Sequence, residues 1–174
     1  KLYASIQPSL AGAERVFSIL DLEEEKIKEG AKELANFNQA IAFENVSFKY
    51  PSRSTAVLTN INVRLEKTKI LAIVGMSGAG KTTLVDLLFR FHEPFAGRIL
   101  IDGINIKDYT LKSLRSNLAL VSQETFLFND TVRKNIAYGR PNASEDDILR
   151  ASKAAHADSF VRDFEDGYST IIGE

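Results

Sequence analysis

The feature that most constrains the fold of this 174-residue chain is a glycine-rich segment at residues 75–82, which reads Gly-Met-Ser-Gly-Ala-Gly-Lys-Thr. It matches the phosphate-binding loop pattern G-x-x-x-x-G-K-[ST] at every fixed position. Glycines let a backbone approach a polyphosphate closely and adopt positive φ angles. Lys81 adds a cation for the β- and γ-phosphates, Thr82 offers a hydroxyl to Mg²⁺, and the helix that follows directs its positive dipole end at the anion. The segment therefore predicts a nucleotide phosphate site.

The residues on either side of the loop supply the context that such a loop requires. Residues 70–74 form a short apolar run rich in β-branched side chains, which is typical of a strand covered on both faces of a parallel sheet. Apolar residues follow the loop at helical spacing as far as Phe91, and we expect Pro94 and Gly97 to close this helix. The alternative is a glycine-rich turn that happens to contain Lys and Thr, and the flanking patterns disfavour it.

Strand patterns before and after this region predict a second sheet. Residues 41–48 and 57–65 mostly alternate apolar and polar side chains, which suits half-exposed strands of an antiparallel subdomain beside the parallel core. Residues 98–101 and 104–106 flank Asp102 and Gly103, so we interpret Asp102 as part of a hairpin turn and not as a magnesium ligand.

The remainder of the chain is predicted to contain one more strand and then mainly helices. We expect a short helix at residues 111–117, a strand at 118–121, and a helix that starts at a capping box formed by Ser144 and Asp147. The predicted fold class is α/β, with a phosphate-binding-loop parallel-sheet core, an antiparallel β subdomain and a partial helical subdomain, as an incomplete domain.

Composition excludes several kinds of site. The chain has no cysteine, which rules out thiol chemistry and zinc–thiolate centres, and its net charge of −1 argues against a dedicated nucleic-acid surface. His92 and His156 have no second ligand at metal-binding spacing, so we expect packing or surface roles for both. No apolar run approaches the length of a membrane span, and the chain is expected to be soluble. Because it opens on Lys1 and not on Met, we expect it to be a piece of a longer protein.

The chain divides into three expected segments. Residues 1–21 form a helix with one apolar stripe, residues 22–39 form a charged linker, and residues 40–174 form the main domain, with its core to about 123 and the start of a helical subdomain at about 124–174. The first helix either packs on its own domain or is the stalk of an upstream domain.

Several segments, taken in order, resemble the nucleotide-binding domain of ATP-binding cassette (ABC) transporters: residues 46–51, 75–83, 101–103, 121–124 and 131–136. The exporter branch, which includes bacterial lipid A and multidrug exporters, is the most similar. Its sequence after the glutamine loop resembles residues 126–139, Phe-Leu-Phe-Asn-Asp-Thr-Val-Arg-Lys-Asn-Ile-Ala-Tyr-Gly, and residues 168–174 resemble the segment that precedes its signature motif. The resemblance implies that the first helix is the end of the last transmembrane helix.

The resemblance also implies roles for individual residues. Tyr50 stands where the family places an aromatic that stacks on adenine, an interaction worth about 1–3 kcal/mol per base. Thr83 is expected to meet the α-phosphate, and Gln123 occupies the glutamine loop, which reaches Mg²⁺ or the attacking water and senses the membrane domain. Arg53 and Val57 either border the nucleotide or are an exposed charge and an ordinary strand residue.

The expected site is the sum of these assignments. Lys81 and Gln123 are the candidate catalytic residues, and Thr82 and Gln123 the candidate Mg²⁺ ligands. The residues expected to bind ATP are Tyr50, Arg53, Gly75, Met76, Ser77, Gly78, Ala79, Gly80, Lys81, Thr82, Thr83 and Gln123.

The family also implies partners and a location. We expect the full-length protein to couple ATP binding and hydrolysis to export of a lipid or drug-like substrate, to contact its own transmembrane domain through coupling helices, and to pair with a second nucleotide-binding domain. It would lie at the cytoplasmic face of the inner membrane and bind no nucleic acid. Phe126, Leu127 and Phe128 either fill the core or line the groove for a coupling helix.

Two further expectations concern activity. In this family the signature motif, the catalytic glutamate and the switch histidine come later in the domain than the residues present here, so we expect this chain not to hydrolyse ATP by itself. The alternatives are a soluble ABC ATPase of DNA repair or translation, which the first helix and residues 126–139 disfavour, and another phosphate-loop enzyme. A GTPase would need an Asn-Lys-x-Asp motif, which is absent; a small-molecule kinase is the other form of this alternative.

Overall fold

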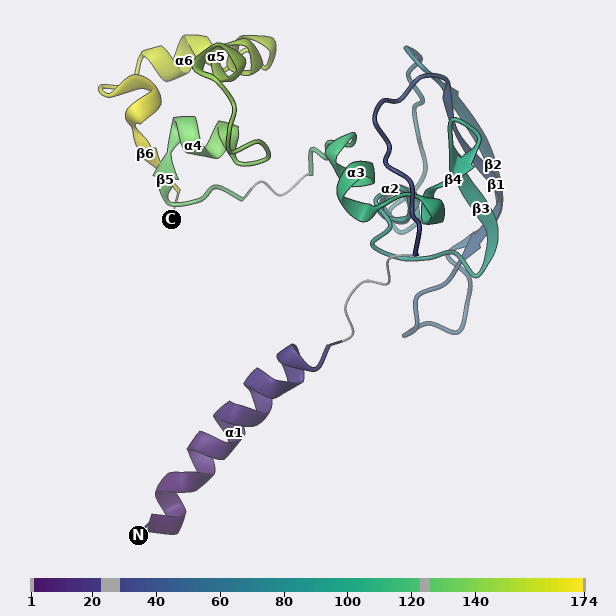
Figure 1. The fold of residues 1–174 in the computed structure, drawn as a ribbon, viewed down its shortest axis with the longest axis horizontal. Coiled ribbons are helices and arrows are strands. Elements are labelled where there is room, and N and C mark those ends of the chain that lie inside the picture. Colours follow the sequence, from purple (N-terminus) through teal and green to yellow (C-terminus); the bar gives the residue numbers. More distant parts are fainter. Residues whose placement is uncertain (1, 23–28, 123–125, 174) are drawn as a thin grey trace. The chain divides into compact units, whose positions relative to one another are not determined.

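The computed structural model describes residues 2–22, 29–122 and 126–173, which form two compact units (Figure 1). The division falls between Ala119 and Leu120. The first unit contains α1 (Leu2–Leu20), β1 (Ala40–Phe48), β2 (Leu58–Glu66), α2 (Lys81–Leu88), β3 (Ala96–Ile101), β4 (Ile104–Asn105), a 3-10 turn (Ile106–Asp108) and α3 (Leu111–Ser116). The second unit contains β5 (Asp130–Thr131), α4 (Val132–Ala137), α5 (Glu145–Ala154), α6 (Asp158–Arg162), a 3-10 turn (Gly167–Ser169) and β6 (Ile171–Ile172).

An antiparallel sheet organises the first unit, with strand order β2-β1-β3-β4. β1 is paired on both sides, so that Ile41 lies opposite Leu65 of β2 and Ile101 of β3. β3 returns into β4 through Asp102 and Gly103, which have φ angles of 51° and 80°. Positive φ at both central residues is what a two-residue hairpin of matching twist requires. The antiparallel subdomain and the Asp-Gly hairpin predicted from the sequence are confirmed.

Helices α2 and α3 cover the same side of this sheet (Figure 1), and together they enclose its core. The side chains of Val46 in β1, Leu87 in α2 and Leu114 in α3 have no exposed surface, and Ile99 and Ile101 of β3 keep 1% each. Full burial of a side chain of this size contributes about 1.5–3 kcal/mol relative to leaving it in water. The helix that follows the glycine-rich loop is therefore fixed to the sheet through Leu87.

α2 ends at Leu88 and does not extend toward Pro94 as the sequence predicts. Arg90 has a φ of 53°, which takes the backbone out of the helix. The Nε of Arg115 donates to the carbonyl of Phe89 at 3.1 Å and so satisfies an acceptor that the helix end leaves free.

The segment before β1 packs into the first unit, although its sequence predicts part of a charged linker. Leu34 is buried, with 5% of its side chain exposed, and its N–H donates to the Ser113 hydroxyl at 2.9 Å. Residues 23–28 of that linker lie outside the described residues.

The Asp102 carboxylate anchors the entry into β1. It accepts the backbone N–H groups of Asn38 and Gln39, each at 2.7 Å, and that of Ala40 at 3.0 Å. Burial opposes ionisation of this group, but the three donors hold the pKa of Asp102 below its ordinary range. The turn residue thus serves the fold, which agrees with its interpretation as a hairpin residue.

Two of the expected strands do not form. Residues 70–74 and 118–121 belong to no strand, and Ile70, Val74 and Val121 are 97%, 89% and 96% exposed. A parallel strand is stable only when a neighbour satisfies its N–H and C=O groups. All strand pairs in the described part of the chain are antiparallel, and none includes these segments. The prediction of a buried strand at residues 70–74 is wrong for this structure, because apolar composition cannot supply a pairing partner.

The second unit is mainly helical and has its own small core, which includes Val132, Ile148 and Val161. Ser144 caps the start of α5: its hydroxyl accepts the N–H of Asp147, while the Asp147 carboxylate accepts the N–H of Ser144. The predicted capping box is confirmed. β5 and β6 form a short antiparallel pair that closes this unit.

No helix in the three described ranges is long and apolar enough to cross a membrane. In α1 the described apolar side chains are exposed, including Leu10, Phe17 and Leu20 at 57%, 59% and 68%.

Candidate functional site

The glycine-rich segment forms an exposed loop that leads into α2. Residues 75–79 are exposed, and Gly78 and Gly80 have φ angles of 79° and 88°, a conformation that side chains with a Cβ disfavour. A Cβ at Gly80 would lie 2.8 Å from the Cδ2 of Leu58, whereas a Cβ at Gly78 would meet no atom within 4 Å. Gly80 is thus required by its packing on β2 and by its backbone conformation. Gly78, on the open side of the loop, is required by its conformation alone.

Lys81, the first residue of α2, folds back over this loop. Its Nζ donates to the carbonyl of Gly75 at 2.9 Å and to that of Met76 at 2.8 Å. Thr82 is exposed one position further along the first turn. Both polar groups expected to meet phosphates and metal therefore stand at the loop, as the sequence predicts.

Tyr50 also lies next to the first turn of α2. It lies two residues after the end of β1, and its hydroxyl lies 3.0 Å from the Oγ1 of Thr83 in α2. Thr83 is buried, with 5% exposed, so this hydrogen bond is sheltered from water. An aromatic ring and the first turn of the phosphate-loop helix are thereby joined, although they are far apart in the sequence.

Two further rings pack around Tyr50. Its centroid lies 4.9 Å from that of Phe48 and 5.1 Å from that of His92, with interplanar angles of 84° and 87°. Phe48 and His92 stack on each other at 5.5 Å and 30°. From the sequence we expect only a surface or packing role for His92, and no spacing rule connects it with Tyr50.

Arg53 and Val57 are placed differently from each other. Arg53 is exposed, and its backbone N–H donates to the carbonyl of Tyr50 at 3.0 Å in the turn after β1. Val57 is half-buried, and its side chain lies beside Gly80, where an added Cβ would approach its Cγ1 to 3.1 Å. Val57 thus supports the loop from beneath.

The metal side of the site rests on fewer residues. Gln123 lies outside the described residues, so its expected contact with Mg²⁺ stays a prediction. Across residues 2–22, 29–122 and 126–173, no group of three or more histidine or acidic side chains could hold a metal ion.

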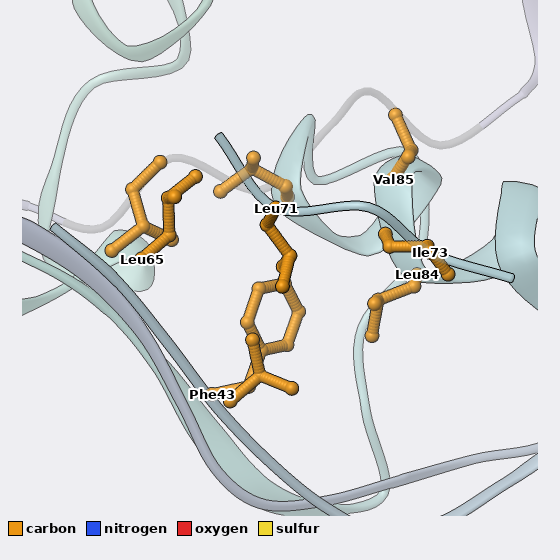
Figure 2. A pocket seen from close by; sticks show the side chains of 9 residues that line it. Phe43, Leu65, Leu71, Ile73, Leu84 and Val85 are labelled. Atoms are coloured by element: carbon orange, nitrogen blue, oxygen red, sulfur yellow. The ribbon is translucent and has the colours of Figure 1, made fainter. Parts of the chain in front are cut away.

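An apolar cavity of about 130 Å³ lies behind the loop, between the sheet and α2 (Figure 2). Figure 2 shows Leu71 and Ile73 of the extended segment together with Phe43 and Leu65 of the sheet and Leu84 of α2. Leu71 and Ile73 are 42% and 41% exposed, about half as much as Ile70 and Val74. One face of the segment thus already packs inward, while the other stays open. All nine lining side chains are apolar, so this cavity suits packing and not phosphate binding.

The loop itself fits a polyphosphate. Among residues 75–79 only Ala79 donates its backbone N–H to another backbone carbonyl, that of Met76 at 3.2 Å. The other backbone N–H groups, the N-terminal end of α2 and the Lys81 ammonium are the kinds of donor that an anion site requires. Tyr50 adds an aromatic surface next to it, which suits a base.

Comparisons with known proteins identify relatives over most of the chain. A sequence profile of a family described as "ABC transporter" matches residues 58–170, more than half of the chain. The "ATP-dependent lipid A-core flippase" of Syntrophus aciditrophicus is 48% identical over 171 residues, covering 98% of this chain and 28% of the relative. The "Fatty acid ABC transporter ATP-binding/permease protein" of Mycobacterium bovis is 46% identical over 171 residues, covering 98% of this chain and 27% of the relative.

A comparison of structures also finds an ABC exporter. A solved structure of a bacterial Atm1-family ABC exporter with ATP bound matches with a TM-score of 0.85 and 39% identity, covering 99% of this chain and 30% of that one. The chain therefore spans less than a third of the length of the proteins that it matches.

Proposed function

Because this chain belongs to the ABC transporter family, as its motifs predict, we propose that it is the ATP-binding part of a longer exporter. That exporter couples ATP binding and hydrolysis to the movement of a lipid-like substrate across a membrane. Relatives named for lipid A-core and fatty acid transport support the substrate class, since both names describe amphiphiles with long acyl chains. No specific observation favours a soluble ABC protein or another phosphate-loop enzyme.

The observation that carries the proposal is the hydrogen bond between Tyr50 and Thr83. It places an aromatic ring beside the first turn of the helix that follows the phosphate loop. A nucleotide needs both a surface for its base and donors for its phosphates, and this contact brings the two together. A generic phosphate loop would require only the second.

Each residue of the loop has a defined task in this proposal. The backbone N–H groups of residues 75–80 other than that of Ala79, together with the Lys81 ammonium, bind the phosphates, and Thr83 meets the α-phosphate. To do so, Lys81 exchanges the carbonyls of Gly75 and Met76 for phosphate oxygens. The bond that is cleaved belongs to ATP, and these residues orient its phosphates and neutralise their negative charge.

Mg²⁺ belongs to the same proposal. The exposed Thr82 hydroxyl would be one ligand of the ion. The resemblance implies that the side-chain carbonyl of Gln123 would be another and that Gln123 would also position water. Hydrolysis requires a metal-binding carboxylate and a water-activating residue in addition.

The second unit offers a surface for the membrane domain. Phe126, Leu127 and Phe128 are 77%, 46% and 37% exposed, so they do not fill a core. Phe128 stacks on Tyr138 at 4.1 Å, which makes a continuous aromatic patch. We assign this patch to a coupling helix of the transporter's own membrane domain, because solvent-exposed apolar patches mark interaction sites.

The proposal includes a second nucleotide-binding domain and a position at the cytoplasmic face of the inner membrane. The backbone N–H and C=O groups of residues 70–74 and 118–121 would pair with further strands of the longer protein. This pairing would complete a parallel sheet beside the antiparallel one.

ATP turnover by the full-length protein in lipid vesicles tests the proposal. We expect Lys81→Ala to lower turnover by at least about 100-fold, since electrostatic groups at the transferring phosphates contribute on that scale. Lys112→Ala, at an exposed lysine of α3, is the matched control and should leave turnover unchanged. Lipid A-core should stimulate the wild-type protein. Unchanged turnover in Lys81→Ala would refute the ATP site, whereas normal turnover without any lipid response would refute only the substrate class.

A further inference from the structure

We propose that His92 is a positioning residue, which orients the ring of Tyr50 for base stacking. The inference rests on the proposed ATP site. It deepens that proposal by naming a residue that the nucleotide does not need to touch.

The backbone does not fix Tyr50 by itself. β1 ends at Phe48, two residues earlier, so Tyr50 lies beyond the last paired strand position. The next backbone contact is a turn in which Arg53 donates to its carbonyl. The direction of the ring therefore depends on its side-chain contacts.

Three residues supply a hydrogen bond or a ring contact to Tyr50. The Thr83 hydroxyl holds the phenol oxygen at 3.0 Å, and Phe48 and His92 pack near the ring with centroids 4.9 and 5.1 Å away. Both ring pairs are close to perpendicular, which is a favoured geometry for aromatic side chains. Tyr50 is half-buried, so part of its surface stays accessible to a base.

His92 differs from the other two in what it contributes to the fold. Phe48 is 3% exposed and belongs to the core, and Thr83 is buried in α2 next to the loop. His92 is half-buried in the turn that follows α2. Its ring contacts are Phe48 and Tyr50, so removing it changes the setting of Tyr50 more than the stability of the unit.

One chain segment therefore holds Tyr50 at two points. Thr83, near the start of α2, bonds its hydroxyl, and His92, just past the end of α2, packs against its ring. Since the phosphate loop leads directly into α2, this helix and the turn after it position both the residue that contacts the base and the loop that contacts the phosphates. His92 acts on the nucleotide through Tyr50 and not by direct contact.

Binding of two probes to the full-length protein separates this role from general damage. Mg-ATP carries a base, whereas Mg-tripolyphosphate engages only the loop. We expect His92→Asn to raise the Kd of Mg-ATP by about 2- to 10-fold, the range that one aromatic pair contributes. It should leave the Kd of Mg-tripolyphosphate unchanged. His92→Phe, which restores a ring, should return the Mg-ATP Kd to the wild-type value.

Two further variants calibrate the measurement. Tyr50→Ala should raise the Kd of Mg-ATP by roughly 5- to 150-fold without affecting tripolyphosphate, because it removes the stacking surface. His156→Asn, an exposed histidine of the second unit with a φ of 56° that asparagine tolerates, should change neither affinity.

Two outcomes would overturn the inference and leave the ATP site intact. In the first, Tyr50→Ala weakens Mg-ATP binding but His92→Asn does not. In the second, His92→Asn weakens both probes equally, which would indicate a structural role. Failure of the wild-type protein to bind either probe would instead overturn the proposed function.

Discussion

Strand β1 contains polar as well as apolar residues, and the segment at residues 70–74 is entirely apolar, yet β1 is the buried one of the two. β1 is paired on both sides, and Val46 at its centre has no exposed surface. In residues 70–74 the side chains of Ile70 and Val74 are almost fully exposed. The difference shows that the hydrogen-bonding neighbours, and not the apolar composition, decide which of the two becomes a strand.

The two sides of the candidate site differ in the same way. Tyr50 is held by the side chains of Thr83, Phe48 and His92, whereas the loop at residues 75–79 continues from the unpaired segment and is exposed. The base side of the site is therefore fixed by packing, and we expect the phosphate side to close on its ligand.

The largest expected difference in the free energy of unfolding is between a variant in the core and a variant in residues 70–74. Leu87→Ala should lower the free energy of unfolding of the 174-residue chain by about 2–5 kcal/mol, because it leaves a cavity under the sheet. Val74→Ala should change it by less than about 0.5 kcal/mol, because Val74 already faces water. Pulse proteolysis in increasing urea measures both. Equal losses would mean that residues 70–74 are packed as firmly as the core.

The two left-handed glycines of the loop offer a smaller contrast. Gly80→Ala should cost about 2 kcal/mol, because its φ is unfavourable for alanine and its Cβ would press on Leu58. Gly78→Ala should cost about 1 kcal/mol, since only the φ angle is at issue. The same urea series compares them. A larger cost at Gly78 would contradict the open space on the outer side of the loop.

The smallest effect tests how β1 is anchored. Asp102→Asn should lower the free energy of unfolding by about 1 kcal/mol at neutral pH, because the charged acceptor of three N–H groups is lost. The folded-state pKa of Asp102 lies below its usual value of 3.8, so this contribution is complete well above pH 3.8 and disappears as pH falls through the folded-state pKa.

Urea unfolding between pH 7 and pH 2 should therefore show a steeper loss of stability on the acid side for the wild-type chain than for Asp102→Asn. Parallel curves for the two proteins would show that the carboxylate contributes nothing to the fold.

Features that depend on neighbouring residues were predictable from the sequence. The hairpin at Asp102 and Gly103 and the capping box at Ser144 and Asp147 follow from local rules, and both are present. The phosphate loop was equally clear, since its spacing fixes the positions of Gly80 and Lys81.

Features that depend on distant residues were not predictable. Residues 70–74 look like a buried strand, but nothing in their own sequence says whether a partner is present. The contact of His92 with Tyr50 joins two turns that no spacing rule relates. The role of Gln123 stays a prediction, because it comes from the resemblance alone.

Hydrogen–deuterium exchange of the full-length protein, with and without Mg-ATP, tests the central claim that an open loop closes on phosphates beside a fixed sheet. Without nucleotide, we predict rapid exchange of the amides in residues 75–82 and slow exchange in β1. At an ATP concentration that saturates turnover, residues 75–82 should become protected while β1 remains as it was. Unchanged exchange of residues 75–82 under those conditions would contradict the account.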